Sequence, residues 1–325
     1  MDSVIKLENV SKNYYIRNIK TFSDYFKFYK PKDKIVAVEN ISFNIEQGEC
    51  IGLVGKNSSG KSTLMKLMTG IIKPTKGSVR IFGDDPEIKR KAIVKRIAAV
   101  FGQRSQLVKD ISAKESYKLL KYIYNVDSKR YEYNVARLTE LLMLGDFINQ
   151  HVRTLSLGQK MRAEFAAAFL HNPAIVFLDE PTLGMDVFTK DIILKFLKFI
   201  NEEQKTTLIF TTHAVNDIAE ICSRILFMQK GVLIADKKIS EIDLYDKVDI
   251  IVSFDKIIEK FDIEQIHSLN FEVDKNNITV FDVNPKKIGD LINSLSSHGK
   301  ITDIKILQDN FEKYFKGVYA DYEAE

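Results

Sequence analysis

The sequence predicts an α/β fold with a mostly parallel sheet flanked by helices, followed by a small α+β domain. Strand-sized apolar runs alternate with helical segments through most of the chain, and this alternation is typical of parallel sheets covered by helices. From about Lys237 the pattern changes to alternating strands separated by helices. We therefore expect two domains, residues 1–238 and residues 239–325.

Composition narrows the class of protein before any motif is considered. The chain has 325 residues, 45% of them hydrophobic, and its net charge of +4 gives no indication of a nucleic-acid partner. The cysteines, Cys50 and Cys222, lie in apolar surroundings and predict neither a disulfide framework nor a metal site. The first residues lack the pattern of a secretion signal, and no run approaches the roughly 20 apolar residues of a membrane span. If the protein works at a membrane, we expect another chain to span it.

Two N-terminal segments, Ser3–Val10 and Val36–Ile45, alternate between apolar and polar residues as half-exposed strands do. Between them lies an insertion over residues 16–35. Its segment Arg17–Lys34 carries aromatic residues at helical spacing among lysines, which predicts a short basic helix ended by Pro31. The aromatic residues are Phe22, Tyr25, Phe26 and Tyr29.

The next elements follow in chain order. The apolar run ECIGLVG predicts a buried strand, and the helix KSTLMKLMTG after it is closed by Gly70. Helix-forming residues from about Ser112 to His151 predict a helical subdomain over about residues 104–155. The strands AIVFLD and TTLIFTT then alternate with the helices Val187–Glu203 and Val215–Cys222. In the second domain we expect the strands DIIVSF, NITVFDV and ITDIKIL and the helices Lys286–Ser296 and Asn310–Tyr319.

The run GKNSSGKS has the pattern of a phosphate-binding loop and lies between a buried strand and a helix start, as that motif requires. Gly55 and Gly60 allow the backbone to wrap so that N–H groups and the helix N-terminus point at a β-phosphate. Lys61 supplies a charge for the β- and γ-phosphates, and the Ser62 hydroxyl can ligate Mg²⁺. The alternative is an ordinary turn in which the serines cap the helix. The predicted nucleotide-binding residues here are Gly55, Lys56, Asn57, Ser58, Ser59, Gly60, Lys61, Ser62 and Thr63.

A second buried strand ends in two adjacent carboxylates, Asp179 and Glu180. On a neighbouring parallel strand, Asp179 would reach the Mg²⁺ beside Ser62, and Glu180 would point at the γ-phosphate. We therefore predict Asp179 as a metal ligand and Glu180 as the general base that orients and deprotonates the attacking water. Without the loop, an Asp-Glu pair after a strand would more often be a helix cap.

The segment RTLSLGQKMRAEFAAAF, which starts at Arg153, opens another helix with a serine-glycine turn. Ser156 and Gln159 form the S-x-x-Q pattern of a capping box, and a helix N-terminus can also bind phosphate. The chain thus has a second candidate phosphate-binding turn besides the loop at Gly55–Ser62.

Six motifs occur in the order and spacing of the ATP-binding subunits of ABC transporters, which this chain resembles. They are GKNSSGKS, FGQ (Phe101–Gln103), LSLGQ (Leu155–Gln159), FLDEPT (Phe177–Thr182), LGMD (Leu183–Asp186) and TTH (Thr211–His213). The resemblance implies a P-loop ATPase fold with additional antiparallel strands, ATP and Mg²⁺ as cofactors, and a head-to-tail pair of ATPase domains. In such a pair, the second turn contacts the γ-phosphate bound by the opposite subunit through Ser156, Leu157, Gly158 and Gln159.

The same resemblance implies roles for further residues. Gln103 corresponds to the glutamine that contacts Mg²⁺ and the attacking water, and His213 to the histidine that contacts the γ-phosphate. Asp186 corresponds to the aspartate that couples the two sites across the dimer. Tyr14 stands where an aromatic residue stacks on adenine, with Tyr15 as a competitor. The chain departs from the family pattern at Ser58, Ser59, Leu157 and Met185. None of these departures removes a charged or metal-binding group, so the resemblance implies an active ATPase.

Within the family, FGQRSQL, RTLSLGQKMRAEFAAAFLHNP and the N-terminal insertion resemble ABC-2-type exporters of the viologen and daunorubicin branch. This implies separately encoded permeases, a second ATP-binding subunit that is either another copy or a different chain, and a peripheral place at the cytoplasmic face of the membrane. By resemblance, the permease contact falls between Gln103 and Tyr117. The alternative is a soluble ABC ATPase that acts on ribosomes or DNA, and a non-hydrolysing module is disfavoured by Glu180 and His213.

The sequence leaves the roles of two segments open. The aromatic-basic insertion lies on lipid, contacts the permease, or packs on the ATPase core. The C-terminal domain, residues 239–325, contains no pattern that suggests chemistry, and it stabilises the dimer or regulates it.

Overall fold

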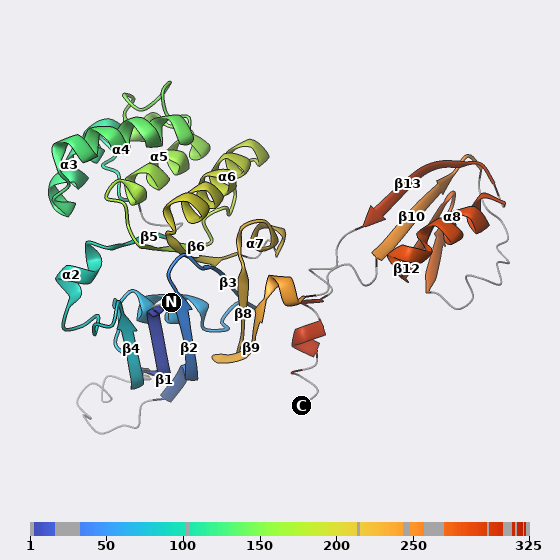
Figure 1. Ribbon diagram of the computed structural model, residues 1–325, viewed down its shortest axis with the longest axis horizontal. Helices are drawn as coiled ribbons and strands as arrows, with labels where there is room; N and C mark the ends of the chain where they lie inside the picture. The colour runs from blue at the N-terminus through green and yellow to red at the C-terminus, as the bar shows by residue number, and fades with distance from the viewer. Residues whose placement is uncertain are drawn as a thin grey trace, which may run out of the picture. The chain divides into compact units, whose positions relative to one another are not determined.

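The computed structural model describes residues 3–16, 33–101, 105–212, 215–242, 248–256, 270–297, 299–307, 314–315, 317–320 and 322. The chain divides into two compact units, Met1–Ile239 and Ser240–Glu325. The predicted fold class is confirmed, because a mixed sheet with helices is followed by a unit of antiparallel strands (Figure 1). In the described part of the chain, no helix combines the length and the apolar character needed to cross a membrane.

A three-stranded antiparallel sheet has the order β2-β1-β4, with bounds β1 Ser3–Ile16, β2 Asp33–Glu46 and β4 Lys76–Ile81. The first two strands are longer than predicted because their polar ends still pair, out to Ile16 opposite Asp33. Ile16 therefore lies in β1 and residues 33–35 lie in β2, which corrects the predicted extent of the insertion, residues 16–35. The predicted aromatic helix that ends at Pro31 lies outside the described residues.

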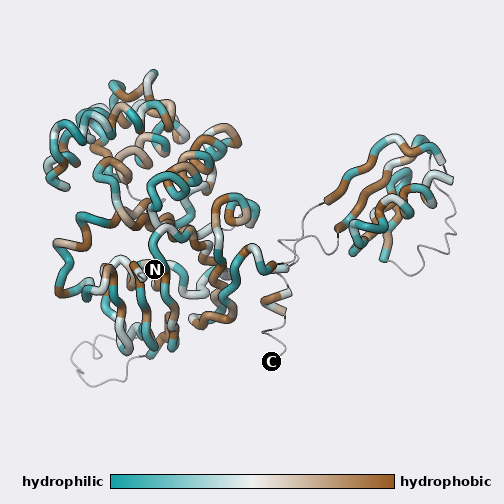
Figure 2. The backbone as a smooth tube through the Cα atoms, viewed as in Figure 1, coloured by the Kyte–Doolittle hydropathy of each residue, from teal (hydrophilic) through white to brown (hydrophobic). Residues whose placement is uncertain are grey.

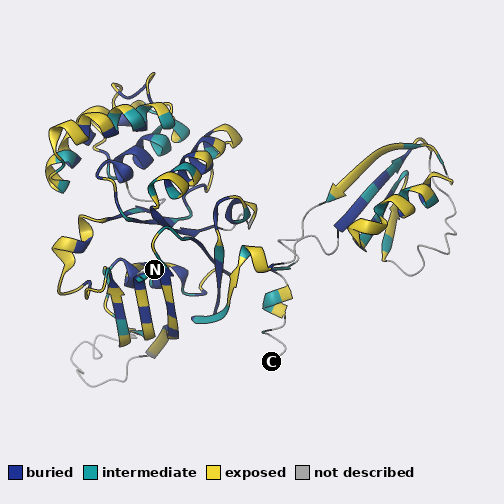
Figure 3. Ribbon diagram, viewed as in Figure 1, coloured by how far each residue is buried: buried dark blue, intermediate teal, exposed yellow. Residues whose placement is uncertain are grey.

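The central sheet has six strands in the order β5-β6-β7-β3-β8-β9. All are parallel except β9, which runs antiparallel to β8. The strands β3, β6 and β7 are buried on both faces, which explains their continuous apolar runs (Figure 3). The bounds are β3 Cys50–Gly55, β5 Ile97–Phe101, β6 Ile175–Asp179, β7 Thr207–Thr211, β8 Arg224–Gln229 and β9 Val232–Lys238.

Helices cover the central sheet, and a group of them gathers on the side away from the three-stranded sheet (Figure 1). That group is α3 and α4 of the predicted helical subdomain together with α5 and α6, and its core includes Phe169 packed edge-on against Phe196 at 4.9 Å between ring centroids. The other face of the sheet shares one apolar core with α1 and the three-stranded sheet (Figure 2). The bounds are α1 Lys61–Met68, α2 Arg90–Val94, α3 Ala113–Tyr124, α4 Ser128–Leu141, α5 Leu157–Phe169, α6 Val187–Gln204 and α7 Val215–Ile221, with short 3-10 helices at Val152–Thr154 and Ile239–Glu241.

The second unit is a four-stranded antiparallel sheet in the order β11-β12-β10-β13, with α8 connecting β12 to β13. Its apolar core lies on one face, between the sheet and α8. The three predicted strands are confirmed, whereas β11 was not predicted because its run FEVD is short and acidic. The predicted helix Asn310–Tyr319 lies partly outside the described residues. The bounds are β10 Val248–Phe254, β11 Phe271–Asp274, β12 Asn277–Val283, a 3-10 helix Pro285–Lys287, α8 Ile288–Ser296 and β13 Ile301–Leu307.

Candidate functional site

The loop between β3 and α1 requires glycine at its two ends. A Cβ on Gly55 would lie 2.2 Å from the Ser59 hydroxyl and 2.5 Å from a backbone oxygen. Gly60 has a φ of 104°, and a Cβ on it would lie 2.5 Å from the Ala37 carbonyl oxygen. A side chain at this position would therefore be strained as well as blocked. The loop therefore turns tightly directly before α1, and it exposes Lys56, Asn57 and Ser58 at its rim.

Lys61 lies beneath this loop, and its side chain points back along it. The ammonium donates hydrogen bonds to the carbonyls of Gly55, at 2.6 Å, and Lys56, at 3.2 Å. Burial lowers the pKa of Lys61, while the nearby charges of Glu180 and Asp179 act in the opposite direction. The fold thus brings these carboxylates, which are more than a hundred residues away in sequence, into the electrostatic range of Lys61.

Asp179 does not lie on a strand adjacent to β3, which corrects one step of the prediction from sequence. The strand β7 is between them and hydrogen-bonds to both β3 and β6. Its last residue, Thr211, is fully buried and donates its hydroxyl to the Asp179 carboxylate at 2.7 Å. Asp179 therefore reaches the edge next to the loop across the end of an intervening strand.

Thr211 also holds the backbone of Glu180. The Glu180 N–H donates to the Thr211 hydroxyl, at 3.0 Å, and to its carbonyl, at 3.1 Å. Glu180 has a φ of 50°, in the left-handed region that non-glycine residues rarely adopt. This conformation directs the chain away from the sheet directly after Asp179. Sequence reasoning assigned no role to Thr211, although it is the first threonine of the TTH motif.

The second predicted turn is a capping box, as expected. The Gln159 N–H donates to the Ser156 hydroxyl at 3.2 Å, and the Ser156 N–H donates to the Gln159 side chain at 3.0 Å. Ser156 and Leu157 are exposed, the latter by 59%. These two residues are therefore accessible to another molecule at the N-terminus of α5.

Asp186 lies against this turn within the same chain. It caps α6 by accepting hydrogen bonds from the Thr189 N–H, at 2.9 Å, and the Thr189 hydroxyl, at 2.7 Å, and these bonds lower its pKa. A Cβ on Gly158 would lie 2.4 Å from the Thr189 hydroxyl and 3.2 Å from the Asp186 carboxylate. Glycine at 158 therefore permits the close contact between the starts of α5 and α6.

A buried carboxylate that sequence reasoning missed connects three segments near this edge. Asp217 on α7 is 1% exposed; it accepts a hydrogen bond from the Thr182 hydroxyl at 3.0 Å and forms an ion pair with Lys190 of α6 at 2.5 Å. Thr182 follows Glu180 by two residues, so the network joins the end of β6 to both helices. Its partners are far apart in the chain, and no sequence spacing identified them.

The remaining predicted site residues lie elsewhere or outside the described part. Tyr14 is on β1, paired with Ile35 and 37% exposed, with the Lys12 ammonium 5.5 Å from its ring centroid. Gln103 and His213 lie outside the described residues, although β5 and β7 end just before them. Their predicted roles stay predictions.

The described residues fit a nucleotide and Mg²⁺. The tight loop has room only for glycine at its ends, Lys61 is held beneath it, and the buried Ser59 hydroxyl has no hydrogen-bond partner among the described residues. The exposed Ser62 hydroxyl and the Asp179 carboxylate are oxygen donors of the kind that Mg²⁺ prefers. Within the described residues, no cluster of three acidic, histidine or cysteine side chains could hold a metal by itself. A Mg²⁺ here would therefore take its other ligands from phosphate, from water and from the predicted ligand Gln103, which lies outside the described residues.

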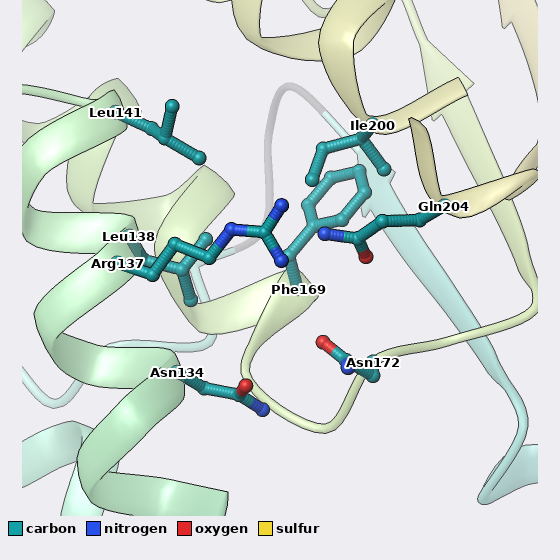
Figure 4. A pocket seen from close by; sticks show the side chains of 8 residues that line it. All are labelled: Asn134, Arg137, Leu138, Leu141, Phe169, Asn172, Ile200 and Gln204. Atoms are coloured by element: carbon teal, nitrogen blue, oxygen red, sulfur yellow. The ribbon is translucent and has the colours of Figure 1, made fainter. Parts of the chain in front are cut away.

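Two hollows in the helical region do not include this loop. One lies between α4 and α6, where Arg137 and Gln204 face each other near Phe169 (Figure 4), and its volume of about 10 Å³ has room for about one water molecule. The other, of about 420 Å³, is open and lies between the end of α4 and the first turns of α6. The residues with phosphate-binding geometry are thus on the edge of the sheet and not in these hollows.

Comparison with known proteins identifies a family. A family model described as ABC transporter matches residues 38–183. The chain is 30% identical over 216 residues to the ABC transporter ATP-binding protein NatA of Bacillus subtilis (strain 168), which covers 66% of this chain and 87% of that protein. It is 27% identical over 318 residues to the bacitracin transport ATP-binding protein BcrA of Enterococcus faecalis, covering 97% and 96% of the two chains. Methionine import ATP-binding proteins also match.

Solved structures agree with these relatives. An ATP-binding cassette, solved as a dimer in a post-hydrolysis state with ADP and Pi, superposes with a TM-score of 0.61 at 28% sequence identity. The match covers 72% of this chain and 98% of the cassette. The shared fold is therefore that of the whole cassette.

Proposed function

Because this chain belongs to the ABC transporter family and is an ATPase of that family, we propose that it drives export through separately encoded ABC-2-type permeases. The observation that carries the catalytic part is the meeting of Lys61, Asp179 and Glu180 at one edge of the central sheet. The chain works as a peripheral subunit at the cytoplasmic face of the membrane. Its ATP-dependent pairing with a second ATP-binding subunit changes the state of the permeases.

Each described residue of the edge has a role in this proposal. Backbone N–H groups of the loop and the N-terminus of α1 bind the phosphates, and Lys61 exchanges its bonds to loop carbonyls for bonds to phosphate oxygens. Ser62 and Asp179 hold Mg²⁺, which neutralises phosphate charge when it is bound. Glu180 accepts the proton of the attacking water. Two further residues lie outside the described part of the chain: Gln103 is proposed to contact Mg²⁺ and the attacking water, and His213 to contact the γ-phosphate. The proposed adenine contact is Tyr14.

The exposed turn at Ser156–Gln159 is proposed to contact the γ-phosphate of the opposite subunit. Its hydroxyl, N–H groups and helix dipole suit an anion, and the dimeric cassette structure supports a paired state. Asp186, which lies against the same turn, then connects that contact to α6. Binding favours the paired state only by the difference in affinity between the paired and separate forms.

Export is supported by the sequence around the signature helix, FGQRSQL and RTLSLGQKMRAEFAAAFLHNP, which resembles the ABC-2 branch. The relative named for bacitracin transport matches along 97% of this chain and so includes the second unit. Because the transport path of such systems lies in the permease, the permease is the partner to isolate.

An affinity pull-down from detergent-solubilised native membranes tests the proposal. The bait is Glu180→Gln, which we expect to bind ATP without turnover, and the matched control is Lys61→Ala, which we expect not to bind it. Recovery of a multi-span membrane protein with Glu180→Gln and ATP, reduced with Lys61→Ala, supports a transporter subunit. Inside-out vesicles expose the cytoplasmic face of the membrane to the medium. If vesicles that contain this permease take up substrate when ATP is added, the direction of transport in the cell is export. Recovery of ribosomal or DNA-repair proteins without a membrane partner would contradict the proposal.

A further inference from the structure

The strand β13 is an exposed edge of the second unit's sheet. Among the described residues it pairs with β10 alone, and residues 302–306 are all exposed (Figure 3). A regular strand at an edge presents a row of backbone N–H and C=O groups that can pair with another strand. An edge of this kind needs a cover or a partner.

In the described part of the second unit, the apolar face of the sheet continues onto this strand with only partial cover. Ile304 pairs with Val252 and Ile306 pairs with Ile250, so both isoleucines lie on the face that carries the core beneath α8. Val252 and Ile250 are fully buried, yet Ile304 and Ile306 are 38% and 47% exposed. The core face therefore ends in two partly exposed isoleucines at the edge.

The opposite face of β13 carries one charge of each sign. Asp303 and Lys305 are both exposed, and their charged groups are 3.7 Å apart. A lysine on an edge strand normally prevents pairing with another chain. It does not prevent pairing with a strand that presents a carboxylate at the opposite position.

A second copy of β13 presents that carboxylate. A two-fold axis perpendicular to the sheet places one residue of β13 opposite itself in the second copy. With the axis at Ile304, Asp303 of each copy lies opposite Lys305 of the other, and Ile304 lies opposite Ile304. With the axis at Asp303 or at Lys305, like charges would meet at the centre.

We propose that β13 pairs antiparallel with β13 of a second copy of this chain, centred on Ile304, and joins two four-stranded sheets into one. The irregular register between Ile301 and Asp303 confines regular pairing to the strand after it. Within that part, from Asp303 onward, the pairs Asp303–Lys305 and Ile304–Ile304 form between the two copies. The pairing covers the exposed isoleucines and neutralises both charges.

The other edge of the sheet does not offer the same partner. The strand β11 has four residues, Phe271–Asp274, and an antiparallel pair centred on Val273 would place Glu272 opposite Asp274, both acidic. Pairing of β13 with β11 of another copy would leave an open edge at each end and produce a chain of molecules instead of a closed dimer. The charges therefore favour pairing of β13 with β13 of a second copy over pairing through β11.

The first experiment measures self-association of the full chain without nucleotide or Mg²⁺ by sedimentation equilibrium. Under these conditions the pairing depends on the second unit and not on the proposed ATP-dependent interface, so the two proposals fail separately. We expect a dimer whose dissociation constant rises about tenfold in Asp303→Lys and in Lys305→Asp, because each substitution places like charges together at two positions. The double variant Asp303→Lys/Lys305→Asp restores opposite charges and should recover the dissociation constant of the unsubstituted chain. Thermal unfolding of each variant checks that these exposed substitutions leave the fold intact.

Cysteine cross-linking then tests the register. The native cysteines, Cys50 and Cys222, are buried. Ile304→Cys should form an intermolecular disulfide under mild oxidation, whereas Ile306→Cys is the matched control, since its two copies would be separated by about 13 Å along the strands. A chain that stays monomeric up to about 100 μM overturns the proposal. Equal weakening in the double and single charge variants, or cross-linking at 306 instead of 304, overturns it as well.

Discussion

The hydroxyl of Thr211 donates a 2.7 Å hydrogen bond to the carboxylate of Asp179, across the ends of two parallel strands. The same hydroxyl accepts a hydrogen bond from the Glu180 N–H at 3.0 Å. One fully buried side chain thus fixes both the proposed metal ligand and the backbone of the proposed general base. Its position between β6 and β3 explains how residues on strands that are not adjacent serve one site.

Replacing Thr211 with valine should lower ATPase turnover by roughly 10- to 100-fold, the worth of a hydrogen bond to a charged group. Valine keeps the shape of threonine but leaves Asp179 and the Glu180 N–H without this partner. Steady-state ATPase assays across a Mg²⁺ titration measure the effect. Thr211→Ser keeps the hydroxyl and is expected to retain most of the activity. Equal rates for the valine variant and the unsubstituted chain would show that the bond does not matter for catalysis.

Lys61→Ala should weaken ATP binding by at least about 100-fold, because it removes the charge-assisted hydrogen bonds to two phosphates. Titration calorimetry in Mg²⁺ measures the affinity directly. Lys66→Ala, at an exposed lysine of the same helix, is the matched control and should bind ATP normally. Comparable affinities for the two variants would remove Lys61 from the proposed site.

Loss of Lys190 should lower the free energy of unfolding more than loss of the Asp217 charge does. Lys190→Met leaves the 1% exposed Asp217 carboxylate without its cation, and it should lower the free energy of unfolding by about 3 kcal/mol. Asp217→Asn keeps an acceptor for Thr182 and leaves a lysine that is 34% exposed, so about 1 kcal/mol is expected. Urea denaturation measures both changes.

An exposed ion pair on the same helix provides the control for that experiment. Lys195 pairs with Asp191 one turn away, with side chains 71% and 48% exposed, and Lys195→Met should change the free energy of unfolding by less than about 0.5 kcal/mol. If Lys190→Met costs no more than this control, the buried network does not hold the segment after Glu180 to α6 and α7.

The free energy of unfolding should decrease at acidic pH because His171 is buried in its neutral form. Its ring stacks on Tyr124 at 3.9 Å, and its Nε2 donates to the Ile97 carbonyl at 3.1 Å. Burial lowers the pKa of His171 from 6.5 to about 4. The unfolded chain therefore binds a proton that the folded chain does not, between about pH 6.5 and about pH 4. The contribution of the neutral ring is complete above this window and decreases as the pH falls through it.

The measurement compares the unsubstituted chain with His171→Phe, which keeps an aromatic ring beside Tyr124. Between about pH 7 and about pH 5, the unsubstituted chain should lose about 2 kcal/mol of unfolding free energy more than the variant. Denaturant titrations at each pH give this difference. Parallel pH profiles for the two chains would mean that His171 takes up its proton equally in the folded and unfolded states.

Local features of the site could be predicted because their partners are close in sequence. The capping box of Ser156 and Gln159 spans three residues, and the loop of Gly55 and Gly60 depends on a turn within one motif. The buried strands could be predicted from continuous apolar runs, since burial on both faces leaves no polar alternation. The strand β11 was missed because its four residues, two apolar and two acidic, give too little pattern.

The sequence by itself determined the cassette, its loop, its acidic strand end and the existence of a second, different unit. Only the tertiary structure decided the order of the strands and hence that Thr211 lies between Asp179 and the loop. It also decided that Asp217 joins Thr182 to Lys190, that Gly158 touches Asp186, and that β13 is an edge. The physical reason is the same in each case: these contacts join segments distant in the chain, and side-by-side placement of such segments depends on the packing of the whole sheet rather than on local conformational preference.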